Sequence, residues 1–311
     1  MDKLAPIALF VYNRPSETAK AIEALRINSL AKKSEIFIFS DAPKSKEEEE
    51  KVKQVRAIIH QIAGFKSVRI TEAEENKGLA NSIIQGVKEL MSKYDKVIVM
   101  EDDLICSLDY LEYMNEALEV YQNNKLIWSI SGYTPNLSFP KAFEEQVYLS
   151  SRGCSWGWAT WKDRWKKVDW GVADFEDFKK DKERREAFNQ GGNDLYKLLE
   201  LHMLGKVDSW AIRWCYSQFK RNTYTVYPVK SKISNHGFNL NGTHNRGKDS
   251  RWDVELCSEK IQLPETVSID KEVFNSFKNY YDLDWVGRSG YFSRKYGFYG
   301  FAQKFKRMFR K

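Results

Sequence analysis

The sequence predicts an α/β protein with a mostly parallel central sheet flanked by helices. Two observations favour this class: short apolar runs alternate with longer amphipathic segments, and a polar turn follows each apolar run. Strands separated by helices of this length pair in parallel through right-handed crossovers. Because 311 residues can bury a sizeable core, we expect one domain over residues 1–270 and a helical, basic and aromatic tail over residues 271–311.

The expected elements follow one another closely in the N-terminal half. Residues 7–12 (IALFVY) are apolar throughout, which is typical of a strand covered on both faces. Polar residues end this strand, and Ser16 with Glu17 can start a helix that runs to residue 25. The elements expected next are a strand at 35–40, an amphipathic helix at 46–63, a strand at 67–71, a helix at 78–91 and a strand at 96–100.

The C-terminal half is less regular. Residues 148–165 are rich in Trp, Gly and Ser, and residues 234–248 form a loop with two of the four histidines. The elements expected here are strands at 126–132 and 223–228 and helices at 174–190, 195–204 and 208–221.

The composition excludes several classes of protein. No run of about 18 apolar residues exists, which excludes a transmembrane helix, and the first strand follows the N-terminus too closely for a signal peptide. The four cysteines contain no CxxC pair, which argues against a zinc site and favours a reducing compartment. We therefore expect a soluble cytoplasmic protein.

The last part of the chain is strongly basic. From Arg288 onward it contains eight Lys or Arg residues and no acid, with Tyr and Phe between them. Such a segment can bind nucleic acid, lie on an anionic membrane or remain a solvated tail. The aromatic side chains favour the membrane, because they insert while the cations meet lipid headgroups. We therefore expect a peripheral contact with the inner membrane face and no nucleic acid partner.

Three expected strands end in polar residues, namely Asn13-Arg14, Asp41 and Glu101-Asp102-Asp103. Ligands of such sheets bind outside the carboxyl ends of the strands. Desolvating adjacent carboxylates is unfavourable unless a cation compensates, and a divalent cation held there can bind a substrate phosphate. The alternative is a solvated acidic turn that caps a helix near residues 107–109.

Residues 97–136 carry a more specific pattern, VIVMEDDLICSLDYLEYMNEALEVYQNNKLIWSISGYTPN. A hydrophobic strand leads into Glu-Asp-Asp, and a hydrophobic residue, an Asp-Tyr helix start and a Trp-containing strand follow. This order resembles glycosyltransferases of the GT-A (Rossmann-like) fold, in particular the N-acetylglucosaminyltransferase I type and the bacterial family 2 sugar transferases. The resemblance is looser over residues 6–250 and does not include the tail after residue 270.

The resemblance implies a metal-dependent, inverting enzyme that transfers a hexosyl or N-acetylhexosaminyl group. The donor would be a nucleotide sugar such as a UDP-sugar, and the acceptor a glycan or lipid-linked glycan in surface polysaccharide synthesis. A nucleotidyltransferase is one alternative, but no Gly-rich basic phosphate loop follows the first strand. A non-enzymatic nucleic-acid-binding protein is the other, although acids line the expected cleft.

The resemblance also implies a metal site. Asp103 would ligate Mn2+ or Mg2+, between which the sequence cannot choose. Asp102 would lie near the ribose or sugar of the donor, with Glu101 as a supporting acid. His244 would complete the metal shell or touch the diphosphate, and His236 competes for this role.

Further donor contacts are implied by the ends of the other strands. Asn13 and Arg14 would meet the nucleotide, Arg14 through its ribose or phosphates. Asp41 would accept the N3–H of a uracil, unless it only forms a turn. Lys77 would contact phosphate, unless it is an ordinary solvated lysine.

The acceptor side would provide a general base and a platform for a sugar ring. Asp208 in Asp208-Ser209-Trp210 is the candidate base, although a helix N-cap explains the same pattern; Asp194 and Asp169 are the next candidates. Trp156 and Trp158 would stack on the acceptor. The other two tryptophans nearby, Trp161 and Trp165, have helical spacing and are expected in the core.

Overall fold

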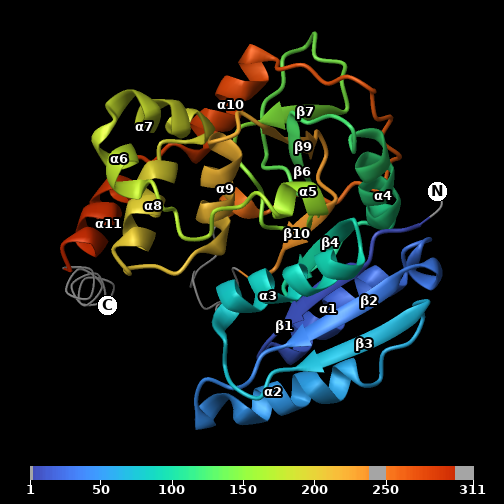
Figure 1. The fold of residues 1–311 in the computed structure, drawn as a ribbon. Helices are drawn as coiled ribbons and strands as arrows, with labels where there is room; N and C mark the ends of the chain where they lie inside the picture. The colour runs from blue at the N-terminus through green and yellow to red at the C-terminus, as the bar shows by residue number, and fades with distance from the viewer. Residues whose placement is uncertain (1–2, 238–249, 298–311) are drawn as a thin grey trace.

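The computed structural model describes residues 3–237 and 250–297, and its centre is an eight-stranded sheet (Figure 1). The strand order is β3-β2-β1-β4-β8-β6-β9-β7. The first four are parallel, as predicted, whereas β8 runs antiparallel to both of its neighbours and β7 antiparallel to β9. The strand bounds are β1 Ile7–Val11, β2 Glu35–Ser40, β3 Ser67–Glu72, β4 Lys96–Glu101, β6 Ile127–Ser131, β7 Val147–Ser150, β8 Trp158–Trp161 and β9 Tyr224–Pro228.

The sheet is covered on both faces, which explains why its first strand is apolar throughout. Alternate residues of β1 enter two different clusters of buried side chains. Ile7 and Leu9 pack with α1 (Pro15–Arg26), α2 (Lys46–Ile59) and α4 (Tyr110–Val120). Ala8 and Phe10 pack with α3 (Gly78–Lys93) and α9 (Trp210–Phe219).

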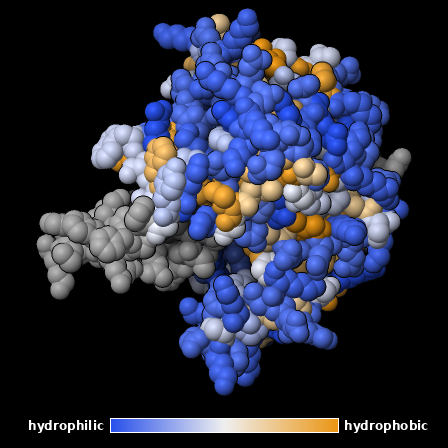
Figure 2. All heavy atoms as spheres, turned by 60° about the vertical axis from the view of Figure 1, so that its left-hand side comes forward, coloured by the Kyte–Doolittle hydropathy of each residue, from blue (hydrophilic) through white to orange (hydrophobic). Residues whose placement is uncertain are grey.

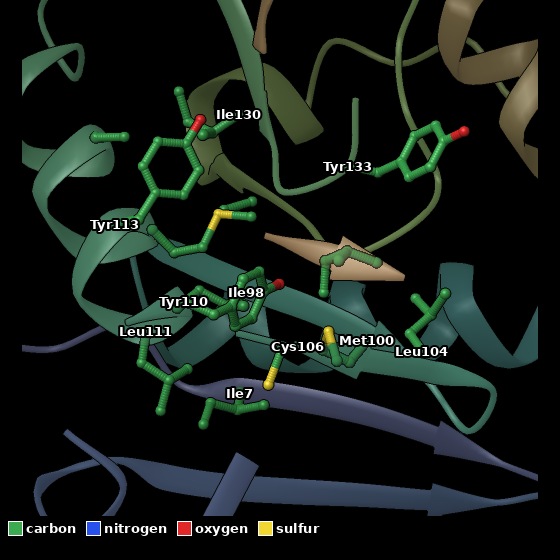
Figure 3. Close-up of a cluster of buried hydrophobic side chains, with 14 of the residues drawn as sticks. Ile7, Ile98, Met100, Leu104, Cys106, Tyr110, Leu111, Tyr113, Ile130 and Tyr133 are labelled. Atoms are coloured by element: carbon green, nitrogen blue, oxygen red, sulfur yellow. The ribbon is translucent and has the colours of Figure 1, made fainter. Parts of the chain in front are cut away.

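Figure 3 shows the first of these clusters beside β1 and β4. Ile7, Ile98 and Met100 project from the sheet toward Tyr110 and Leu111 of α4, and all five side chains are fully buried. A continuous hydrophobic contact of this kind fixes α4, and with it the turn of acids between β4 and the helix.

A second, two-stranded sheet brings a distant segment back to that turn. In this sheet β5 (Leu104–Cys106) pairs antiparallel with β10 (Ile233–Asn235), so that Asn235 lies opposite Leu104. The fully buried Lys232 Nζ, 2.5 Å from Asp109 Oδ2, ties the same segment to the start of α4. The chain after β10 is therefore held beside Asp103.

The remaining helices lie mostly to one side of the sheet (Figure 1). Among them α10 buries Val273 and Phe277 in the main core. None of the helices in the described part of the chain is long and apolar enough to cross a membrane. Their bounds are α5 Lys162–Trp165, α6 Phe175–Lys180, α7 Lys182–Phe188, α8 Leu195–Met203, α10 Lys271–Tyr281 and α11 Trp285–Lys295.

The predicted elements agree with the structure except in three respects, the first being that β5 and β10 were not predicted. The helix expected at 174–190 is broken at Asp181, whose carboxylate accepts the Arg184 N–H at 3.0 Å and caps α7. The segment at 148–165 forms the end of β7 and all of β8, which the sequence did not predict. His244 and the residues after 297 lie outside the described part of the chain.

Candidate active site

The polar strand ends predicted to form a site do share one edge of the sheet. In the parallel register, Phe10 of β1 pairs with Glu101 of β4. Val11 of β1 pairs with Ser40 of β2, and Ser40 pairs with Glu72 of β3. The residues that follow these positions therefore emerge at the same carboxyl edge, where ligands of such sheets bind.

Three acids at this edge face one cation. Asp103 forms an ion pair with Arg14 Nη1, and Asp102 accepts the backbone N–H of Tyr12 at 2.9 Å. Burial, followed by repulsion from Asp103, raises the pKa of Asp102 to about 7. Burial, and then Asp103 and Asp102, raise the pKa of Glu101 well above its usual range. A further cation would offset this repulsion and favour the ionised acids, so the cluster is suited to binding one.

The segment after β10 closes one side of this cluster. The His236 N–H donates to the Asp103 backbone oxygen at 2.8 Å, so His236 lies beside the predicted metal ligand. A Cβ at Gly237 would lie inside van der Waals contact of the Asp103 carboxylate. Sequence reasoning missed Gly237, because only the pairing of β5 with β10 brings it here.

Asp41 organises the turn that leads into α3. Its Oδ1 accepts the N–H groups of Ala42 and Lys77, each at 2.9 Å, and its Oδ2 accepts the Gly78 N–H at 2.9 Å. The Asn76 side-chain amide adds a fourth donor at 3.2 Å. A carboxylate has about four acceptor positions, so the predicted contact with a base N3–H would have to replace one of these bonds.

Glu48 of α2 was not predicted as a site residue, yet it positions the loop after β1. Its carboxylate accepts the Asn13 amide at 3.0 Å and the Tyr12 hydroxyl, and it also accepts the Lys44 N–H at 3.2 Å. Asn13 is therefore engaged in holding two loops together. The Lys77 side chain is exposed and its Nζ lies 3.0 Å from Gln85 Oε1, as expected of a solvated lysine.

Asp208 lies directly before α9 with a side chain that is 66% exposed. The N-cap of this helix is Ser209, which accepts the Ile212 N–H at 3.3 Å, so capping does not account for Asp208. Trp210 packs in one cluster with Phe10 and Ala80, at the carboxyl end of β1 and the start of α3. The first turn of α9 is thus anchored in the cluster of buried side chains on this face of the sheet.

The other two candidate bases are occupied. Asp194 forms a bidentate pair with Arg152 at 2.7 and 2.9 Å. Asp169 accepts the backbone N–H groups of Gly171 and Ala173 at 3.1 and 2.9 Å. These contacts favour Asp208 as the acidic residue on the acceptor side.

The two tryptophans predicted to bind the acceptor have different environments. The prediction for Trp158 is wrong: its side chain is fully buried against Trp165, Trp210 and Trp214. The alternation along β8 turns this ring into the core, where Trp165 also lies as predicted.

Trp156 is half-buried and lines a cavity of about 160 Å3 together with Tyr281, Ala211 and Ile212. The two α9 residues in this lining follow closely on Asp208. Asp208 itself is not among the residues that line this cavity.

The described residues contain no group of three or more His, Cys, Asp or Glu side chains able to hold a metal ion by themselves. Mg2+ in phosphate-binding enzymes is commonly held by one or two carboxylates together with substrate phosphates. The acid cluster fits that arrangement better than an all-protein metal site.

Residues 7–151 match the family model described as glycosyl transferase family 2. These residues are similar to a family 2 glycosyltransferase domain, and the match covers 145 of the 311 residues of the chain, slightly less than half. The match supports the predicted enzyme class and the GT-A type of fold, and it favours a glycosyltransferase over a nucleotidyltransferase or a nucleic-acid-binding protein. The narrower resemblance to the N-acetylglucosaminyltransferase I type stays a prediction. The domain includes Arg14, Asp41 and the three acids, whereas Asp208 lies beyond it.

Solved structures resemble the chain only distantly. A mannosyltransferase from Pyrobaculum calidifontis, in complex with GDP-Man and Mn2+, is 12% identical over 42% of this chain and 36% of its own, with a TM-score of 0.32. S. aureus TarS is 9% identical over 73% of this chain and 36% of its own, with a TM-score of 0.43. The chain thus spans about a third of the length of these two proteins. A comparison with curated protein sequences gives no match.

Proposed function

We propose that the chain is a metal-dependent, inverting glycosyltransferase that uses a nucleotide sugar, most simply a UDP-sugar. The acceptor would be a glycan or a lipid-linked glycan in surface polysaccharide synthesis. The observation that carries the proposal is the cluster of Glu101, Asp102 and Asp103 beside Arg14, at the carboxyl edge of a family 2 domain.

Asp103 would hold Mn2+ or Mg2+, with Asp102 behind it and the donor diphosphate supplying further oxygen ligands. Bound there, the cation would neutralise the charge that develops on the departing nucleoside diphosphate. Arg14 already pairs with Asp103 and would contact the same phosphates. We propose His244 as a further ligand of this metal ion. His236 is the alternative, and its backbone contact with Asp103 supports it.

Asp208 would act as the general base. As the acceptor oxygen attacks the anomeric carbon and the bond to the diphosphate breaks, the hydroxyl proton passes to the Asp208 carboxylate. Its exposure and its place before α9, a helix that contributes Ala211 and Ile212 to the cavity lined by Trp156, support this role. Arg213 Nη2 lies 3.7 Å from Asp208 Oδ1 and would help to hold the carboxylate in place.

The proposed place of action is the inner face of the membrane, where lipid-linked acceptors are found. Support comes from the basic, aromatic sequence after Arg288.

The proposal is tested by thermal unfolding of the full chain with UDP-sugars, with and without Mn2+. We expect stabilisation that EDTA removes, absent in Asp103→Asn and retained in Asp208→Asn. Transfer should be lost in both variants, with release of UDP rather than pyrophosphate in the wild type. Asp95→Asn is a matched control, because its side chain is 95% exposed. Indifference of the wild type to every nucleotide sugar and metal would overturn the proposal.

A further inference from the structure

Helix α11 exposes three aromatic side chains along one side. Trp285, Phe292 and Tyr296 are 80%, 53% and 62% exposed. They are spaced by seven and four residues, so they lie on the same side of the helix. The rings of Phe292 and Tyr296 stack with an interplanar angle of 3°. Single exposed apolar residues are ordinary, whereas an aligned aromatic stripe is a feature of contact surfaces.

A neighbouring side of α11 is fixed to the domain. Lys295 Nζ lies 2.8 Å from Glu200 Oε2 of α8, and the Tyr291 hydroxyl donates to the same buried carboxylate. The Asp284 carboxylate caps the helix by accepting the Gly287 N–H at 2.8 Å. Because these contacts set the rotation of the helix, the aromatic stripe is directed outward rather than into the core.

The sequence that follows Asp284 is basic. Arg288 and Arg294 are exposed on the same helix, and the chain from residue 285 to residue 311 has eight basic residues and no acid. Figure 2 shows the molecule with the side that carries α11 turned forward, where hydrophobic side chains emerge in separate patches from a largely hydrophilic surface.

We propose that the aromatic stripe of α11 is a docking surface for an anionic lipid bilayer. Trp, Tyr and Phe favour the boundary between headgroups and acyl chains, and flanking Lys and Arg are attracted to anionic headgroups. A helix of 11 residues lies at such a boundary and does not span it. A protein partner or a second copy of the chain would match the apolar stripe equally well, but only an anionic surface also complements the eight cations.

The test uses full-length protein and sedimentation with two kinds of vesicle, phosphatidylcholine alone and phosphatidylcholine with one quarter phosphatidylglycerol. We expect at least tenfold stronger partitioning to the anionic vesicles, and a loss of at least tenfold in the double variant W285S/F292S. The matched control is L126S/L204S, which removes two exposed leucines elsewhere and should change partitioning less than twofold. The single variant W285S keeps the test available if the double variant unfolds, with an expected loss of about threefold.

Three results would overturn the proposal. These are no wild-type binding to anionic vesicles, equal loss in the stripe variant and the control, and a stripe variant that binds vesicles normally but changes its oligomeric state in solution. The last would assign the stripe to contacts between copies of the chain. None of these measurements depends on catalysis, so the proposal can fail while the proposed reaction stands.

Discussion

Replacing Asp41 by Asn would disrupt the junction between β2 and α3. The carboxylate accepts three backbone N–H groups and the Asn76 amide, two donors on each oxygen. An asparagine has one oxygen and one NH2 group. Whichever way the new side chain is placed, two donors lose their acceptor and face another donor.

The expected cost follows from these contacts. Leaving a buried donor without its acceptor costs about 1–3 kcal/mol, and more for bonds to a charged group. The donors are partly buried, so we expect the free energy of unfolding to fall by about 2–4 kcal/mol. At about 2–4 °C per kcal/mol for a large domain, the Tm should fall by about 5–15 °C.

The assay is thermal unfolding by circular dichroism without nucleotide or metal. Asp95→Asn makes the same chemical change at an exposed site whose one ion pair, to Lys162, is 3.6 Å long. The control should stay within about 0.5 kcal/mol of the wild type. An Asp41→Asn protein that unfolds like the wild type but has lost nucleotide binding would refute the structural role, and would support the base contact predicted from the sequence.

Two further predictions concern the acid cluster. Gly237→Ala should push the Asp103 carboxylate aside and weaken Mn2+-dependent UDP binding, measured by calorimetry, at least tenfold. The control is Gly290→Ala, whose added methyl would meet nothing within 4 Å. Equal affinities in the two variants would contradict the packing argument. The pKa of Asp102, raised to about 7 from 3.8, means that the native state keeps a proton that the unfolded chain releases. In EDTA the free energy of unfolding should therefore be greatest near the unfolded-state pKa of 3.8 and fall as the pH rises through about 7. Denaturant titrations should find this pH dependence reduced in Asp102→Asn. Identical pH dependence in the two proteins would contradict the prediction.

Local patterns were sufficient for most of the central sheet. The runs at 7–12, 35–40 and 96–100 predicted β1, β2 and β4, because a strand buried on both faces needs an uninterrupted apolar sequence. The short strands β5 and β10 carry no such pattern. Their pairing joins Leu104 to Asn235, which are 131 residues apart in the sequence, and three-residue strands are defined by their partners.

The same distinction holds at the candidate site. Three acids after an apolar strand are recognisable in the sequence, since their mutual repulsion is a property of adjacent residues. Their ion pair with Arg14, the packing of Gly237 on Asp103 and the four donors around Asp41 depend on residues that are distant along the chain. The prediction for Trp158 was wrong for this reason. Its sequence neighbours resemble those of a binding residue, but its burial depends on contacts with distant tryptophans.

From its order of residues alone, this chain is recognisable as a wound α/β domain with a cluster of acids at one strand end. These features need only periodicity, turn chemistry and the proximity of neighbours in sequence. The folded chain was needed to show which polar side chains already have hydrogen-bond partners. It was also needed to show which tryptophan is buried and which side of α11 is exposed. Each of these depends on packing between segments that the sequence separates, and no local pattern encodes that packing.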